Sequence, residues 1–110
     1  MVQILNRKQE ISQQLACYAV VDFIRSMIQE CYPGLVENLR KAIEEEGDGE
    51  VCLHCAEGLT QIPVIELIKL IQMRILKAKP GEDCAFVQVQ DLLKLVDPEV
   101  DFELPGDRQQ

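Results

Sequence analysis

Three stretches of the chain repeat apolar residues with the spacing of an α-helix. Residues 9–31 place apolar side chains on one helix face, and a Pro-Gly pair ends this pattern. Residues 35–43 carry a second apolar stripe, which runs into the acidic, glycine-containing stretch 44–50. Residues 64–76 are apolar at nearly every position, which is typical of a helix in the centre of a core. The pattern therefore predicts two N-terminal helices and a central apolar helix.

A short apolar run lies between the second and third predicted helices. This run, Val51 to His54, follows two glycines, and we interpret it as a short buried strand. We expect a tight turn carrying Cys55 after the strand. Pro63 suits the first turn of the next helix, because its missing N–H would have no partner there. Residues 82–96 fit an alternating strand and a helix equally well, and the pattern leaves both open.

Length and composition limit the chain to one small domain. Its 110 residues are 47% hydrophobic and 27% charged, which is typical of a globular protein with a core. We predict a helix-rich α/β fold that forms a single compact domain over residues 1–104. Residues 105–110 are polar and are predicted to be a disordered tail.

The charge balance excludes some classes of partner. The formal net charge is -8, and the eleven cations are scattered along the sequence. Nucleic-acid surfaces need a stripe of Lys and Arg, so we predict no nucleic-acid partner. No apolar run is long enough to cross a bilayer, so we predict no membrane partner either. A protein partner is compatible with the charge. Five cysteines without a secretory signal indicate reduced thiols and an intracellular protein, cytoplasmic or nuclear.

Candidate chemistry gathers after the predicted strand. The segment His54-Cys-Ala-Glu-Gly-Leu-Thr-Gln61 resembles the HCxxGxxR loop of protein tyrosine and dual-specificity phosphatases. A looser resemblance covers residues 35–102. In such a loop, backbone N–H groups and a helix N-terminus lower the pKa of a nucleophilic thiol and bind phosphate. The resemblance implies Cys55 as the nucleophile position and Gly58 as the loop glycine.

The chain departs from this signature at the residues that carry the chemistry. Gln61 stands where the family has arginine, and a neutral amide cannot neutralise a phosphate dianion. The region before residue 35 is predicted to be helical, and Asp22, the only acid in reach of the general-acid position, lies in it. The resemblance therefore implies a degenerate phosphatase-like domain that binds proteins without catalysis, and it ranks an active phosphatase lower. The predicted binding residues are Leu53, His54, Cys55, Glu57, Gly58, Leu59 and Gln61.

The same residues also form a linear motif. Leu53-His-Cys-Ala-Glu57 matches LxCxE, with apolar Leu59 two residues further on. It is similar to the motif by which papillomavirus, adenovirus and polyomavirus oncoproteins bind retinoblastoma-family pocket proteins. In that mode leucine and cysteine fill apolar pockets, glutamate accepts backbone N–H bonds, and nearby acids steer association. This resemblance implies a viral-type accessory protein that binds a host pocket protein.

Two further hypotheses concern the cysteines and the first helix. Cys52 and Cys55 form a Cys-x-x-Cys motif, which is typical of a redox pair at a helix start. Cys52 lies inside the predicted strand, however, and alternation places the two thiols on opposite faces, which disfavours this hypothesis. A single cysteine pair also disfavours zinc, and we predict no metal and no cofactor. A structural role is an alternative for Cys55, as a buried core residue.

A helical dimerisation module is an alternative function for the whole chain, because Phe23 lies off the main apolar face of the first helix.

Overall fold

The computed structural model describes the backbone of residues 2–102 and the side chains of residues 15–102. In chain order its elements are α1 (Val2–Cys31), α2 (Leu35–Glu46), β1 (Glu50–Cys52), α3 (Leu53–Thr60), α4 (Val64–Gln72), β2 (Lys79–Pro80), β3 (Ala85–Gln88) and α5 (Val89–Val96). Helix accounts for 61% and strand for 10%, so the predicted helix-rich α/β class is confirmed. The predicted tail, residues 105–110, lies outside the described residues.

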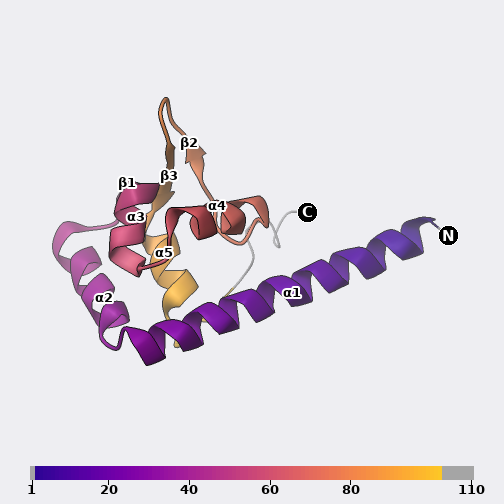
Figure 1. The fold of residues 1–110 in the computed structure, drawn as a ribbon, viewed down its shortest axis with the longest axis horizontal. Helices are drawn as coiled ribbons and strands as arrows, with labels where there is room; N and C mark the ends of the chain where they lie inside the picture. The colour runs from indigo at the N-terminus through magenta and orange to yellow at the C-terminus, as the bar shows by residue number, and fades with distance from the viewer. Residues whose placement is uncertain (1, 103–110) are drawn as a thin grey trace.

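The three strands form a small antiparallel sheet in the order β1-β3-β2. In the central strand, Phe86 lies opposite Cys52 on one side and Lys79 on the other. The β2–β3 hairpin stands out from the body of the molecule (Figure 1). Gly81 is required in its loop, because an added Cβ would lie 2.5 Å from Cε2 of Phe86 and 2.6 Å from the carbonyl oxygen of Cys84.

The elements after α1 follow one another in a recognisable order. Helices α3 and α4 pack together and are joined by a three-residue turn, as in a helix-turn-helix unit. Helix α2 and strand β1 precede this pair and the hairpin follows it, with β1 pairing with the second strand of the hairpin. Helix α1 runs along one side of this unit, and its N-terminal half extends away from it (Figure 1). Among the described residues, no helix has the combined length and hydrophobicity needed to cross a membrane.

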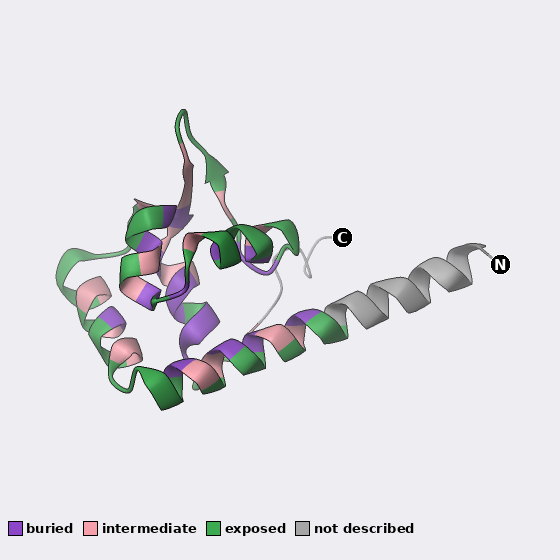
Figure 2. Cartoon of the chain, viewed as in Figure 1, coloured by how far each residue is buried: buried purple, intermediate pink, exposed green. Residues whose placement is uncertain are grey.

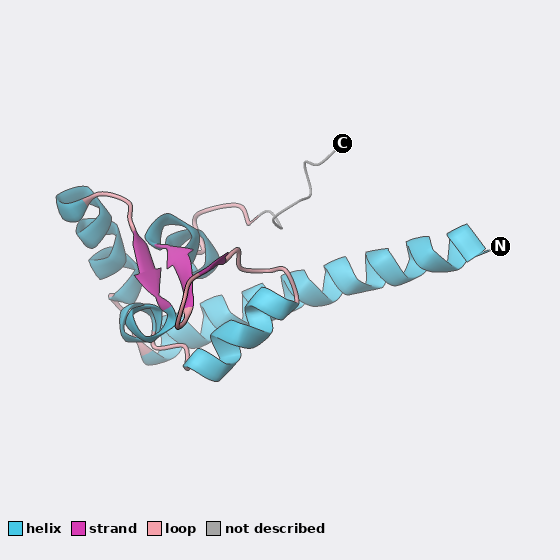
Figure 3. Ribbon diagram, turned by 90° about the horizontal axis from the view of Figure 1, so that it is seen from above, coloured by secondary structure: helices cyan, strands magenta, loops and turns pink. Residues whose placement is uncertain are grey.

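Helix α5 lies at the centre of the core. It packs against α1, α2, α3 and β3, and Figure 3 shows it behind the sheet. Its buried side chains are Val89, Leu92, Leu93, Leu95 and Val96. Helix α1 packs against it, and the face of α1 that carries Cys17, Val21, Ile24 and Ile28 is buried in the core. The region that the sequence left open between strand and helix therefore contains both, β3 followed directly by α5.

Both ends of α5 are fixed by polar side chains from distant elements. At its start, Asp48 accepts a hydrogen bond from the backbone N–H of Gln90 at 2.9 Å. At its end, Arg25 of α1 donates to the carbonyl oxygens of Leu95 and Lys94 at 3.1 and 2.8 Å. These bonds satisfy backbone groups that a helix leaves unpaired at its ends. They hold the core helix in place between α1 and the loop before β1.

The predicted apolar helix is α4, and it differs from the prediction in two respects. It ends at Gln72, and only one of its sides is buried. Leu67 and Leu70 are 0% and 3% exposed, whereas Ile65 and Ile68 are 61% and 37% exposed. Figure 2 shows the exposed residues of α4 on its outer side. The helix thus lies at the surface of the domain, with α5 in the central position.

Candidate functional site

The residues predicted to form the site lie on the short helix α3. Strand β1 ends at Cys52, and the helix begins at Leu53 with no turn between them. The predicted tight turn around Cys55, and the extension of the strand to His54, are therefore wrong. The physical reason is that Leu53 and Ala56, three residues apart, are both buried on one helix face. The turn lies instead at residues 61–63, between α3 and α4.

The positions implied by the phosphatase resemblance do not form a curled loop. Cys55 and Gly58 lie on the exposed side of α3, and a Cβ at Gly58 would meet nothing within 4 Å. Gln61 ends the helix with a left-handed φ of 64°. Its backbone N–H donates to the carbonyl oxygen of Glu57 at 2.7 Å, and its side-chain amide donates to that of Gly58 at 3.2 Å. The segment is thus organised by bonds within the helix, and the phosphatase resemblance stays a prediction.

The LxCxE residues are also held inside α3. Leu53 is only 6% exposed and belongs to the core, while Glu57 and Leu59 are half-buried. An extended motif would place its leucine in a pocket of the partner. Docking in that way would require α3 to unwind and Leu53 to leave the core. Binding to a retinoblastoma-family protein therefore stays a prediction, with no support from the folded geometry.

The two cysteines of the Cys-x-x-Cys motif meet at the start of α3. Cys52 is the N-cap residue, with φ -72° and ψ 167°, and Cys55 is the third residue of the helix. The prediction that their thiols face opposite sides is wrong, because the strand ends at Cys52 and its alternation stops there. Cys84 comes from the loop before β3, two residues before Phe86, which pairs with Cys52. Two different elements therefore bring three thiols together.

The surroundings of these thiols affect their acidity in opposite directions. The pKa of Cys52 is lowered, first by the backbone N–H of Cys55 and next by the Cys55 thiol, with smaller contributions from the N–H of His54 and the Cys84 thiol. The side chain of Cys52 makes no capping hydrogen bond in the structure. The nearby N–H groups and thiols therefore lower its pKa by stabilising the thiolate form. The pKa of Cys55 is raised, mainly by its hydrogen bond with Cys52. These opposite shifts arise because the two thiols interact with each other.

The described side chains contain no metal-binding group. Within residues 15–102, no three or more His, Cys, Asp or Glu side chains are arranged to hold a metal ion. This includes the region around Cys52 and Cys55. The cysteines are all free thiols: Cys17 is buried, Cys52 and Cys84 are half-buried, and Cys31 and Cys55 are exposed.

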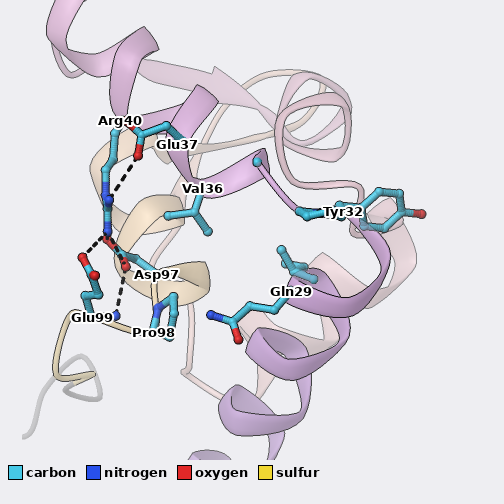
Figure 4. Close-up of a pocket in the computed structure, with 11 residues that line it drawn as sticks. Gln29, Tyr32, Val36, Glu37, Arg40, Asp97, Pro98 and Glu99 are labelled. Atoms are coloured by element: carbon cyan, nitrogen blue, oxygen red, sulfur yellow. Dashed lines mark hydrogen bonds and ion pairs between the residues drawn. The ribbon is translucent and has the colours of Figure 1, made fainter.

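A hollow of about 470 Å³ lies between the end of α1, the start of α2 and the turn after α5 (Figure 4). Its charged wall is an ion-pair network around Arg40. The guanidinium donates to both carboxylate oxygens of Asp97, at 2.8 and 2.7 Å from Nη2, and to Glu99 at 2.8 Å. A weaker bond of 3.3 Å joins it to Glu37. Hydrogen bonding to Asp97 is the main cause that raises the pKa of Arg40.

This network has a structural role. Asp97 is only 2% exposed, and a carboxylate buried to that degree needs a paired cation. Arg40 meets that need and is already engaged by three acids, so the hollow offers no free cation to an anionic ligand. The sequence did not predict this ion pair. No local pattern could reveal it, because 57 positions separate the two partners.

The outward face of α4 is defined here by the exposed apolar residues Ile65 and Ile68, with Met73 just past the end of the helix. These side chains are 61%, 37% and 40% exposed, and the exposed polar residues Glu66, Lys69 and Gln72 lie among them. The surrounding charge also differs from that of the whole chain. Residues 64–79 contain one acid and four cations, a net charge of +3, while the other residues carry -11. The overall charge of -8 conceals this difference.

The chain was compared with models of protein families, with curated proteins and with solved structures, and none of the three comparisons found a match. A functional assignment therefore has to be argued from the geometry of the chain itself. Three places have features of a functional site: the thiols at the start of α3, the hollow beside Arg40, and the outward face of α4.

Proposed function

We propose that the protein is a non-catalytic protein-interaction module, and that it binds an acidic amphipathic segment of a partner on the outward face of α4. One observation carries the proposal. Helix α4 buries the side that bears Leu67 and Leu70, and on its outer side Ile65 and Ile68 are exposed among the polar residues Glu66, Lys69 and Gln72. Two isoleucines this exposed leave apolar surface that the domain itself does not cover. The uncovered side is the kind of patch that marks a protein-binding surface.

The position of α4 supports this proposal. In a helix-turn-helix unit the second helix is the one that faces outward and contacts a partner. Here α4 is that second helix, and its exposed isoleucines, Ile65 and Ile68, lie three positions apart, as neighbouring anchors of a helix that docks into a groove do. Binding would bury the isoleucine and methionine side chains at these positions against an apolar partner surface, which is favourable because it removes apolar surface from water.

The composition of α4 disfavours nucleic acid as this partner. The helix contains a single cation, Lys69, and its ammonium group lies 3.4 Å from a carboxylate oxygen of Glu66. A recognition helix needs cations for phosphates and polar side chains for base edges. Two of its exposed side chains are Ile65 and Ile68 instead, and neither can form those hydrogen bonds.

Charge complementarity indicates the chemistry of the partner. The net charge of +3 over residues 64–79 comes from four cations, Lys69, Arg74, Lys77 and Lys79, and one acid, Glu66. Lys69 lies 3.4 Å from Glu66 and Lys79 lies 3.9 Å from Glu50, while no ion pair of Arg74 or Lys77 is found among the described residues. A partner segment with apolar residues on one side and acids at its edges would match both the apolar face and this charge. A basic segment would be repelled here, although it would suit the remaining, strongly acidic surface. The proposal therefore predicts a preference for the acidic segment at this face.

A peptide titration tests the proposal. The probe is a synthetic amphipathic helix of about 18 residues, long enough to fold, with leucines on one face and glutamates elsewhere. Its control replaces each glutamate by lysine. In amide NMR spectra of the full chain, we expect the acidic peptide to shift resonances of residues 64–74 with micromolar affinity, and the lysine peptide to leave them unchanged.

Matched variants locate the binding surface. Changing Ile65→Ser together with Ile68→Ser should weaken binding at least about tenfold, which corresponds to about 1.4 kcal/mol. Leu15→Ser is the control, because Leu15 is 66% exposed but lies on α1. The proposal is overturned if the lysine peptide binds α4 equally well, if shifts appear only elsewhere, or if duplex DNA shifts residues 64–79 at the same concentration.

We also infer that the protein acts inside the cell, in the cytoplasm or nucleus. The support is that all five cysteines are free thiols, two of them exposed, and exposed thiols persist in reducing compartments. Fractionation of cells that produce the protein tests this inference. Recovery only from the medium or from an oxidising compartment would contradict it.

A further inference from the structure

The start of α3 has chemical features that binding on α4 does not use. Cys52 at the N-cap and Cys55 in the first turn come from one motif, and Cys84 is added from the hairpin loop. The side chains of N-cap and third helix residues approach each other at a helix start. Cys55 is exposed and Cys52 is half-buried, so a small molecule can reach the pair.

We propose that Cys52 and Cys55 form a redox-active dithiol, which closes to a disulfide by exchange with a small-molecule disulfide of the glutathione type. The placement of the two residues permits the bond. Residues three apart at a helix start have Cα atoms within the range of roughly 4.4–6.8 Å that a disulfide requires. The sheet does not oppose closure, because β1 ends at Cys52 and Cys55 belongs to the first turn of α3.

Cys52 is the nucleophile of the pair. It is the N-cap residue of α3, next to the backbone N–H groups of the first turn, and these groups lower the pKa of Cys52. Cys55, the third residue of the helix, acts second. Cys84 lies close enough to Cys52 to be an alternative partner, but it approaches from a separate loop. Cys31 offers a useful contrast, since it is an exposed thiol at the C-terminal end of α1.

The exchange proceeds in two steps. The Cys52 thiolate attacks one sulfur of the small-molecule disulfide; a mixed disulfide forms, and the other sulfur leaves as a thiolate that takes a proton from water. Cys55 then releases its proton to water and attacks Sγ of Cys52. The Cys52–Cys55 bond forms, and the second small thiolate leaves and is protonated. The two cysteines lose two electrons and two protons, and the small disulfide becomes two thiols.

Peptide mapping of the full chain tests the proposal. The reduced protein is incubated with oxidised glutathione, quenched with acid, alkylated and digested with trypsin. Cys52 and Cys55 share the tryptic peptide 42–69, whereas Cys84 lies in 78–94, because the Lys79-Pro80 bond resists cleavage. We expect peptide 42–69 to lose two hydrogen atoms and to resist alkylation. The disulfide between Cys52 and Cys55 should form at least about tenfold faster than glutathione adds to Cys31.

Single substitutions separate the two roles. Cys55→Ser should stop the reaction at a glutathione adduct on Cys52, and Cys52→Ser should abolish both the adduct and the disulfide. Cys84→Ser and Cys31→Ser should leave the disulfide unchanged. A cross-link between peptides 42–69 and 78–94, an adduct forming first on Cys55, or reaction no faster than at Cys31 would overturn the assignment. Circular dichroism of each variant confirms that the fold is retained.

Discussion

Gln61 is the residue whose role changes most between the sequence and the structure. Its φ of 64° is left-handed, a backbone conformation that residues other than glycine and asparagine seldom adopt. The position is the C-cap of α3, where a left-handed residue closes the helix by donating its N–H backwards, here to Glu57 at 2.7 Å. The side-chain amide adds a bond to Gly58. Gln61 therefore ends a helix, and this role accounts for the residue without any phosphate ligand.

This role leads to a prediction about the signature arginine. We expect Gln61→Arg to produce no phosphatase activity, because six helical positions place Cys55 and residue 61 roughly 120° apart around α3. The arginine would also lie outside any curled loop around the thiol. Hydrolysis of p-nitrophenyl phosphate measures the activity, with Gln61→Arg combined with Cys55→Ser as the control. Turnover that depends on Cys55, in the variant or in the unchanged chain, would contradict both this prediction and the non-catalytic proposal.

At the scale of elements, the sequence predicts long patterns better than short ones. The helical periods of α1 and α2 are confirmed because each extends over several turns with one apolar face. The run from Val51 to His54 is too short for its period to be read, so the junction was misplaced by two residues. For α4 the composition indicated a buried helix. Composition does not show, however, whether the apolar surface of a helix is covered by its own chain or by a partner.

The two sides of α4 can be compared directly. Leu67→Ala should lower the free energy of unfolding by about 3 kcal/mol, because Leu67 is fully buried and its loss leaves a cavity. Ile65→Ala should change it by less than about 0.5 kcal/mol, since that side chain is mostly exposed. Urea unfolding followed by circular dichroism measures both. Similar losses for the two variants would show that α4 is covered on both sides, and would remove the basis for binding there.

At the scale of the whole molecule, the decisive contacts join residues that are far apart in the sequence. Arg40 meets Asp97, Arg25 ends α5, and Cys84 approaches Cys52. Each partner looks ordinary in its own segment, because a local pattern carries no information about pairing across the fold. This explains why the helix-rich class could be predicted while the thiol cluster and the buried ion pair could not. The dimerisation hypothesis stays a prediction: Phe23 is 68% exposed on α1.

The pair formed by Arg40 and Asp97 should stabilise the whole domain, since it fastens α2 to the turn after the core helix α5. Asp97→Ala removes a nearly buried carboxylate that accepts bonds from the guanidinium and from the backbone N–H of Glu99. We expect a loss of about 2 kcal/mol in the free energy of unfolding, the range for hydrogen bonds to charged groups. Glu99→Ala is the control: its side chain is 78% exposed, so the loss should stay below about 0.5 kcal/mol. Urea unfolding at neutral pH measures both. Equal losses would mean that burial of Asp97 adds nothing, and that the pair acts only as a surface contact.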